Sequence, residues 1–143
     1  MNLSPQIEQK IKSSFAGQTM MTTFGAALAE ISPGAVTITA TIPGRCRQQH
    51  GFGHAAHTFG LGDSAAGYAA LSVMPEQAEV LTSEMKIHLL APAQGDRIEA
   101  VGRVVKPGRR LVIVQAEVFA ITGATRTQIA LLTGTMVPIL PKC

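Results

Sequence analysis

Aromatic residues, charged residues and cysteine are all scarce in this chain of 143 residues. The chain has no tryptophan, one tyrosine and five phenylalanines, so it offers few rings on which nucleic-acid bases would stack. Lysine and arginine number 12 against 9 acidic residues, and the basic residues are scattered apart from two small groups. Because an extended basic surface is also missing, we expect no nucleic-acid partner.

The two cysteines and the apolar segments indicate the cellular compartment in which the protein is expected. Cys46 and Cys143 are far apart and lack a metal-type spacing, which predicts reduced thiols in a cytosol-like compartment. The N-terminal segment has no apolar stretch of the signal-peptide kind. The most apolar windows, 20–29 and 128–140, are interrupted well short of the roughly 18 residues that a membrane span needs. We therefore expect a soluble, cytoplasmic protein without a membrane partner.

Apolar residues make up 46% of the chain, which is enough for one domain with its own core. The length is too short for two such domains, so we expect a single domain over residues 1–143. Near the N-terminus, Ser4 and Pro5 are typical of a helix start and precede apolar residues at helical spacing. This pattern predicts a first helix over 4–15.

Alternating apolar and polar residues predict strands in much of the remaining chain. The predicted strands lie near residues 24–31, 36–42, 82–89, 97–104, 111–118 and 126–138. Residues 44–53 form a loop, and the small residues of 54–73 predict a thin helix packed closely against a broad surface. This order predicts an α+β fold in which about six antiparallel strands curve around the helix. An open sheet edge would remain, and we expect a second copy of the chain to cover it.

One carboxylate, Asp63, stands among the small apolar residues of segment 47–67. On a helix that begins at residue 54 it shares a face with Phe59 and with two alanines, so that face is expected to be dry. Partial desolvation would raise the pKa of the Asp63 carboxyl and make it a better proton acceptor. The pattern leaves open a solvated or capping acid in a helix interrupted at Gly62.

The residues before that helix suggest a site for an oxyanion. Gly51 and Gly53 precede His54, Ala55 and Ala56, so free backbone N–H groups are expected at the start of the helix. Such groups hold a carbonyl oxygen that gains negative charge during a reaction. An ordinary capped helix start is the alternative.

Three histidines invite a metal interpretation, because His50, His54 and His57 have the spacing H-x3-H-x2-H. The glycines at positions 51 and 53 argue against a continuous helix there, and no nearby acid or cysteine completes a ligand set. We therefore expect a polar or capping role and no bound metal.

Two other features have two interpretations each. Lys106, Arg109 and Arg110 flank a Pro-Gly turn, where they would contact phosphates or form a solvated hairpin tip. Strict alternation places Thr82 on the opposite strand face from Met85, and on the residues alone it is a β-forming side chain on a solvated face.

Several of these motifs, taken together, resemble one family. The segment HGFGHAA with Asp63 nine residues after His54, then LTSEMKIHLLAPAQGD and RVVKPGRRL, resembles hotdog-fold acyl-CoA thioesterases of the phenylacetic-acid-degradation (PaaI-like) type. The resemblance extends over about residues 20–138. The family motif is N-x-x-G-x-x-H-G-G, then an acid on the long central helix, then Ser or Thr on a strand before P-A-x-x-G-D.

The resemblance implies the fold, the assembly and the reaction. We expect a hotdog fold, with the active site between two subunits and dimers that pair into a homotetramer. The implied activity is hydrolysis of an acyl-CoA thioester to free acid and coenzyme A, with no cofactor apart from the substrate. A catalytically weak module that binds or senses acyl-CoA is the second function that the sequence leaves open.

The resemblance also assigns roles by position. Asp63 is implied as nucleophile or general base, and Thr82 as the residue that positions the attacking water. Gly51 and His54 match the motif, and Gln48 stands where the family usually has Asn.

Ala55 and Ala56 replace the two family glycines. Ala55 takes the position whose N–H polarises the thioester carbonyl, and the added methyl groups would narrow the site.

For the substrate, the resemblance places the nucleotide end of coenzyme A at the loop with Gly108, Arg109 and Arg110. We expect an apolar acyl group, because three apolar or aromatic residues are predicted to line its pocket: Phe59, Met85 and Leu89.

Overall fold

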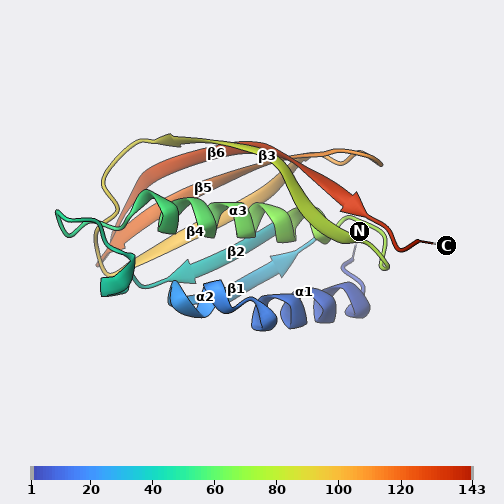
Figure 1. The fold of residues 1–143 in the computed structure, drawn as a ribbon, viewed down its shortest axis with the longest axis horizontal. Coiled ribbons are helices and arrows are strands. Elements are labelled where there is room, and N and C mark those ends of the chain that lie inside the picture. The colour runs from blue at the N-terminus through green and yellow to red at the C-terminus, as the bar shows by residue number, and fades with distance from the viewer. Residues whose placement is uncertain (1, 143) are drawn as a thin grey trace.

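The structure is a computed structural model that describes residues 2–142. A six-stranded sheet curves around one long helix, and two shorter helices lie beside it (Figure 1). The elements are α1 (Pro5–Gly17), α2 (Thr19–Thr23), β1 (Ala26–Ser32), β2 (Ala35–Ala40), a 3-10 turn (Gly44–Cys46), α3 (Ala55–Leu71), β3 (Glu79–Leu89), β4 (Arg97–Lys106), β5 (Val112–Thr122) and β6 (Thr125–Ile139). This is the hotdog arrangement that the resemblance implies, and it confirms the predicted order of strands around a central helix.

The sheet has the strand order β1-β2-β4-β5-β6-β3, and every neighbouring pair is antiparallel. Its two edges are therefore β1 and β3. β1 is short, carries a register shift between Leu28 and Glu30, and contacts α1. β3 is longer, and most of its side chains are exposed, with Leu81 59% and Leu89 56% exposed. β3 is therefore the longer of the two open edges and the one more available to pair with another strand.

α3 lies across the concave face of the sheet, and most of its residues are buried. Small residues permit this close approach. A Cβ added at Gly102 on β4 would collide with the Ala65 backbone, and one added at Gly62 would come within 2.8 Å of Leu132. The glycines and alanines thus serve close packing rather than helix propensity, as the sequence predicts.

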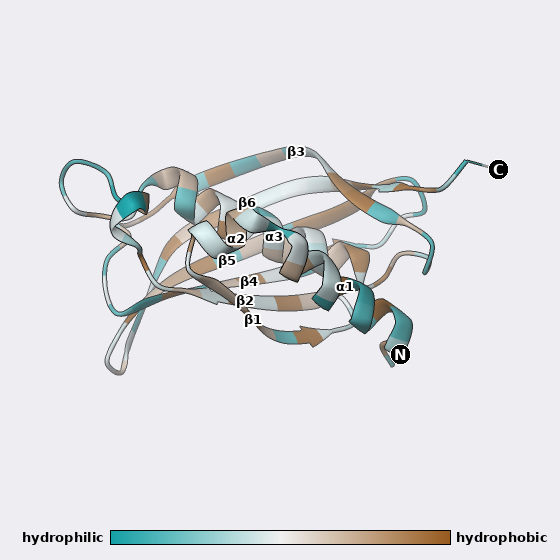
Figure 2. Cartoon of the chain, turned by 60° about the horizontal axis from the view of Figure 1, so that its bottom comes forward, coloured by the Kyte–Doolittle hydropathy of each residue, from teal (hydrophilic) through white to brown (hydrophobic). Residues whose placement is uncertain are grey.

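α1 begins as expected, because Ser4 caps it and its Oγ accepts a hydrogen bond from the Ile7 N–H at 3.1 Å. The helix runs to Gly17, two residues beyond the predicted end, and α2 follows it directly without a sequence prediction. On α1, the fully buried Ile11 belongs to the main core, while hydrophilic and apolar residues alternate along the rest of this helix (Figure 2). No helix among residues 2–142 is both long and apolar enough to cross a bilayer.

Candidate active site

Asp63 on α3 and Thr82 on β3 meet at the rim of a cavity. The Thr82 hydroxyl donates a hydrogen bond to Asp63 Oδ1 at 2.7 Å, and its oxygen lies 3.3 Å from the sulfur of Met136 on β6. The cavity has a volume of about 260 Å³. Its lining consists of Ser14, Gln18, Asp63, Ser64, Gly67, Tyr68, Val80, Leu81, Thr82 and Met136.

The prediction that Thr82 lies on the opposite strand face from Met85 is wrong, although its side chain is exposed as expected. Thr82 pairs with Met136 while Glu84 pairs with the next residue of β6, so Ser83 is an extra residue in β3. This β-bulge interrupts the alternation and turns the Thr82 side chain inward, to the same side as Met85. Bulges commonly redirect a side chain next to a functional site, and this one delivers a hydroxyl to Asp63.

The environment of Asp63 favours its protonated form. Burial raises the pKa of the Asp63 carboxyl above its ordinary value, and the hydrogen bond from Thr82 opposes that rise. Among residues 2–142, no group donates a hydrogen bond to the second carboxylate oxygen, Oδ2. Asp63 therefore combines increased basicity with an oxygen that is free to accept a proton.

A second cavity, of about 400 Å³, lies at the start of α3. Residues of the preceding loop, of the helix start and of the end of β3 line it: Gln48, Phe52, Gly53, His54, Ala55, Thr58, Leu89, Ala91, Pro92 and Ala93. His54 is the N-cap of α3, and its Nδ1 accepts the Ala56 N–H at 2.9 Å. The Ala55 N–H donates to no acceptor within the described part of the chain, so it is the free donor at this helix start.

Loop 44–53 is held in place by hydrogen bonds of its own. The Gly53 N–H donates to the Ala93 carbonyl at 2.8 Å, and the Arg47 guanidinium donates to the Gly51 carbonyl at 2.6 Å. Gly51 has a φ of 88°, a conformation that favours glycine. The Gln48 side-chain oxygen accepts the His50 N–H at 2.5 Å, which leaves its amide NH₂ group for other partners.

Within one chain, the acid and the free amide are too far apart to act on the same bond. Ala55 and Asp63 are eight positions apart on α3, which corresponds to about 12 Å along the helix axis. The two cavities share no lining residue. Each chain therefore carries two separate halves of the predicted constellation: Asp63 with Thr82, and Ala55 with Gln48 and His54.

The three histidines of the predicted metal spacing have separate surroundings. His57 is buried, with Nε2 3.0 Å from the Phe24 carbonyl oxygen and its ring edge-on to the Phe24 ring. Burial is the main cause that lowers the pKa of its imidazole. His54 caps α3 and His50 is exposed. No cluster of three His, Cys, Asp or Glu side chains suited to a metal occurs between residues 2 and 142.

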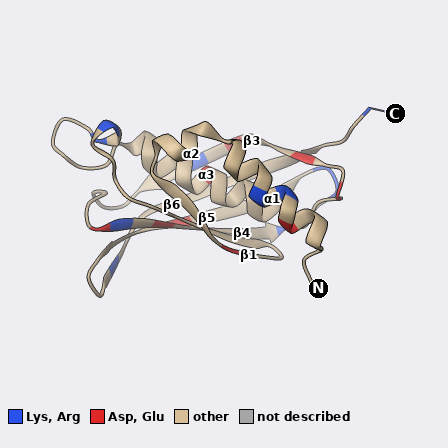
Figure 3. Ribbon diagram, turned by 90° about the horizontal axis from the view of Figure 1, so that it is seen from below, with Lys and Arg blue, Asp and Glu red and all other residues tan. Residues whose placement is uncertain are grey.

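The predicted substrate contacts are dispersed. Phe59 and Met85 pack against the core, and Leu89 lines the helix-start cavity, so none of the three lines the Asp63 cavity. The loop with Gly108, Arg109 and Arg110 is exposed between β4 and β5. It lies at the same end of the sheet as Thr82, because Val112 pairs with Met136, which pairs with Thr82. Lys and Arg residues elsewhere are spread over separate segments (Figure 3).

The sequence prediction missed the polar side of the Asp63 cavity. Its polar residues come from α1, from the junction after it and from α3: Ser14, Gln18, Ser64 and Tyr68. Tyr68 lies on the same helix as Asp63, but five positions turn it about 140° around the helix axis, so the spacing of a shared face does not indicate it. The other side of the cavity depends on where α1 packs, which is a tertiary contact that no local pattern reports.

Comparisons with known proteins agree with this architecture. Residues 50–127 match the sequence profile of the thioesterase superfamily. A thioesterase family protein from Silicibacter pomeroyi has 40% identity and a TM-score of 0.92, with 94% of this chain and 99% of that chain covered. The PaaI protein from the phenylacetic acid degradation operon of E. coli has 22% identity and a TM-score of 0.84, with 96% of each chain covered.

A thioesterase from Haemophilus influenzae shares the fold at 14% identity and a TM-score of 0.80, with 89% of this chain and 87% of that chain covered. No match was found among curated proteins.

Proposed function

Because the chain belongs to the thioesterase superfamily, we propose that it hydrolyses an acyl-CoA thioester to the free acid and coenzyme A. The observation that carries this proposal is the contact between Asp63 and Thr82 at a cavity, with the carboxyl pKa raised by burial. A basic carboxylate and an adjacent hydroxyl are the groups needed to position and deprotonate a water molecule.

The complete site is proposed to form between two copies of the chain. Thr82 near the start of β3 borders the Asp63 cavity, and Leu89 at the end of β3 borders the helix-start cavity. If two β3 edges pair antiparallel, the start of one strand lies beside the end of the other. The Asp63 cavity of one copy then faces the Ala55 cavity of its partner, and two-fold symmetry creates two equal sites.

In this arrangement the reaction follows from the residues. The partner's Ala55 donates its N–H to the thioester oxygen, which gains negative charge as the carbonyl carbon becomes tetrahedral. Asp63 takes a proton from water while the water oxygen bonds to that carbon, and Thr82 orients the pair. The carbon–sulfur bond then breaks, and the proton passes from Asp63 to the departing sulfur to give the coenzyme A thiol.

Direct attack by Asp63 is the other route that the geometry supports, through an acyl anhydride that water cleaves afterwards. A single turnover in water labelled with oxygen-18 detects direct attack in which water cleaves the anhydride at the Asp63 carbonyl carbon. That route leaves oxygen-18 in the Asp63 carboxylate and a protein oxygen in the product acid, whereas the water route places oxygen-18 in the acid and never labels the protein.

The remaining parts of the proposal concern the rest of the substrate and the assembly. Gly108, Arg109 and Arg110 lie at the same end of the sheet as Thr82, where the two arginines would contact the phosphates of coenzyme A. We infer a homodimer that pairs into a homotetramer and needs no cofactor. Cys46, which is buried and free, is in keeping with a reducing cytoplasm.

A thiol-trapping assay with a series of acyl-CoA thioesters tests the activity. Replacing Asp63 by Asn keeps the shape and removes the base, so kcat should fall by at least about 100-fold. Circular dichroism and the urea midpoint check that the variant still folds. Equal turnover by Asp63→Asn and wild type would refute the mechanism.

One observation favours a second function. Ala55 stands at the free amide, and its methyl group adds bulk where the thioester carbonyl must approach. A module that binds acyl-CoA without turnover would show saturable binding in calorimetry and no release of thiol.

A further inference from the structure

The side of the Asp63 cavity formed by α1, the residue after it and α3 is polar. Tyr68 is buried, and its hydroxyl oxygen lies 3.0 Å from Ser14 Oγ and accepts a hydrogen bond from Gln18 Nε2 at 3.0 Å. Ser64 donates to the Gln18 side-chain oxygen at 3.4 Å. All four of these side chains line the same cavity as Asp63.

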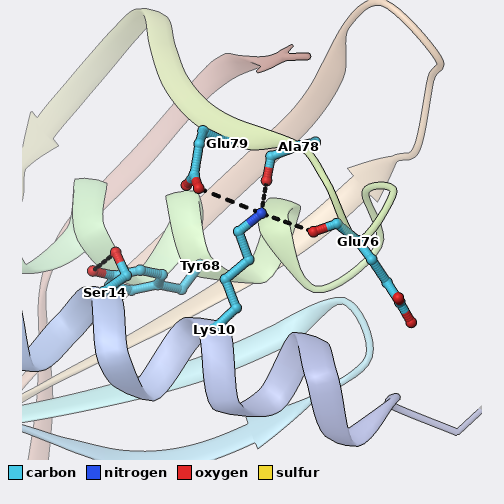
Figure 4. Close-up of polar contacts among 6 residues, drawn as sticks. All are labelled: Lys10, Ser14, Tyr68, Glu76, Ala78 and Glu79. Atoms are coloured by element: carbon cyan, nitrogen blue, oxygen red, sulfur yellow. Dashed lines mark hydrogen bonds and ion pairs between the residues drawn. The ribbon is translucent and has the colours of Figure 1, made fainter. Parts of the chain in front are cut away.

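Contacts within one chain fix the position of α1 beside this polar wall. Lys10 reaches from α1 to the segment before β3, where it donates to the carbonyl oxygens of Glu76, at 2.9 Å, and Ala78 and lies 3.4 Å from the Glu79 carboxylate (Figure 4). In the same view the Ser14 and Tyr68 hydroxyls point toward one another. Because these ties join α1 to the β3 side of the cavity, the polar wall does not depend on a second copy.

Some donor hydrogens of this polar wall have no acceptor within the wall. The three hydroxyls carry one hydrogen each and the Gln18 amide carries two, which makes five donor hydrogens. The three hydrogen bonds among these groups use three of them and leave two for a ligand or for water. A purely aliphatic acyl end would displace water from these donors without replacing its hydrogen bonds, which is unfavourable.

The charges around the cavity disfavour a ligand that carries a carboxylate. Asp63 is the only carboxylate in the lining, and the lining contains no Lys, Arg or His. The nearby Lys10 already binds two carbonyl oxygens and Glu79. A ligand carboxylate here would have no counter-charge and would lie close to Asp63, whereas an uncharged oxygen needs none.

We propose that Ser14, Gln18 and Tyr68 form a specificity site for acyl groups that carry an uncharged oxygen, a hydroxyl or a ketone, at their distal end. This inference rests on the proposed function and adds the substrate class. Tyr68 follows Asp63 by five positions on α3, a rise of about 7.5 Å along the helix axis, so the polar oxygen is expected several bonds away from the reacting carbon.

Three thioesters of nearly equal shape test the proposal on the full chain. 5-Oxohexanoyl-CoA carries a ketone several bonds from its thioester, 5-methylhexanoyl-CoA has a methyl group in place of that oxygen, and glutaryl-CoA has a carboxylate at the same position. We expect kcat/KM for the ketone to exceed that for the methyl compound by on the order of 10-fold, with glutaryl-CoA the poorest. Equal values for the first two, or a preference for glutaryl-CoA, would overturn the proposal.

Variants connect the preference to the named residues. Gln18→Leu and Tyr68→Phe keep the size of the side chain and remove hydrogen-bonding groups, so the ketone-to-methyl ratio should fall toward one in each. Because the readout is a ratio within one protein, a partial loss of folded protein does not alter it. Gln9→Leu is the matched control, since Gln9 is exposed on α1 and bonds only to Ser13, and it should keep the wild-type ratio. A ratio that stays at the wild-type value in Gln18→Leu and Tyr68→Phe would refute the assignment.

The proposed function and this inference fail in different ways. If no thioester, acetyl-CoA included, releases thiol, the proposed hydrolase activity is wrong. The same three compounds are then compared by calorimetric binding to the full chain, where the ketone should bind more tightly than the methyl compound. Equal binding would overturn the specificity site as well.

Discussion

A site divided between two copies of the chain predicts a particular pattern of complementation. Ala55→Pro removes the free N–H at the start of α3, and proline is well tolerated there because it is the first helical residue and His54 has a ψ of 145°. The loss of one such donor costs about 10²- to 10³-fold in kcat, or roughly 3–4 kcal/mol. Asp63→Asn removes the base with a loss of about 10²- to 10⁴-fold. Each variant alone should therefore be nearly inactive.

A heterodimer of the two variants should regain activity. One of its sites combines Asp63 from the first chain with Ala55 from the second and is intact, while the other carries both changes. Co-expression with two different tags isolates this heterodimer, and we expect about half of the wild-type kcat per dimer, since one of its two symmetric sites is whole. The reciprocal heterodimer, of wild type with the double variant Ala55→Pro/Asp63→Asn, has one defect in each site and should be inactive.

A site contained within one chain gives the opposite results. The first heterodimer would then be inactive, and the second would retain half of the activity through its wild-type chain. Either of those outcomes would refute the reasoning from the ~12 Å separation of Ala55 and Asp63 along α3.

Two further predictions concern pH. Thr82→Val removes the hydrogen bond that lowers the pKa of Asp63, so the acid limb of the kcat/KM profile should move to higher pH. Thr135→Val, which removes a 2.7 Å hydrogen bond to Glu84 away from both cavities, should leave the limb in place. Burial lowers the pKa of His57 below 6.5, so the unfolded chain binds more protons and the free energy of unfolding should fall as pH drops below 6.5. His57→Gln should lose that dependence in urea titrations, and an unchanged pH dependence in this variant would contradict the assignment.

Local patterns predicted the elements of this fold well. Alternation of apolar and polar residues predicts the strands, because each strand buries one face. The small residues after His54 predict the buried helix, because a helix buried on most sides has few polar positions. The close contact of Gly102 with the Ala65 backbone shows why that helix needs residues with little or no side chain. Asp63 at a cavity and the free amide at Ala55 also agree with what those patterns predict.

The parts that the sequence did not predict depend on irregular or distant structure. The orientation of Thr82 depends on a single extra residue in β3, which shifts every later side chain relative to strict alternation. Ser14 and Gln18 come to the cavity only because α1 packs beside α3, about 50 residues away in the chain.

The two sheet edges differ in a way that limits how the molecule polymerises. β1 is short and in contact with α1, whereas β3 is longer and exposes most of its side chains, Leu81 and Leu89 among them. If two copies join β3 to β3 as proposed, both long edges are used in one step and only the short β1 edges stay exposed. Association through backbone pairing would then end with a closed pair, which would keep a chain rich in β-structure from extending into fibrils.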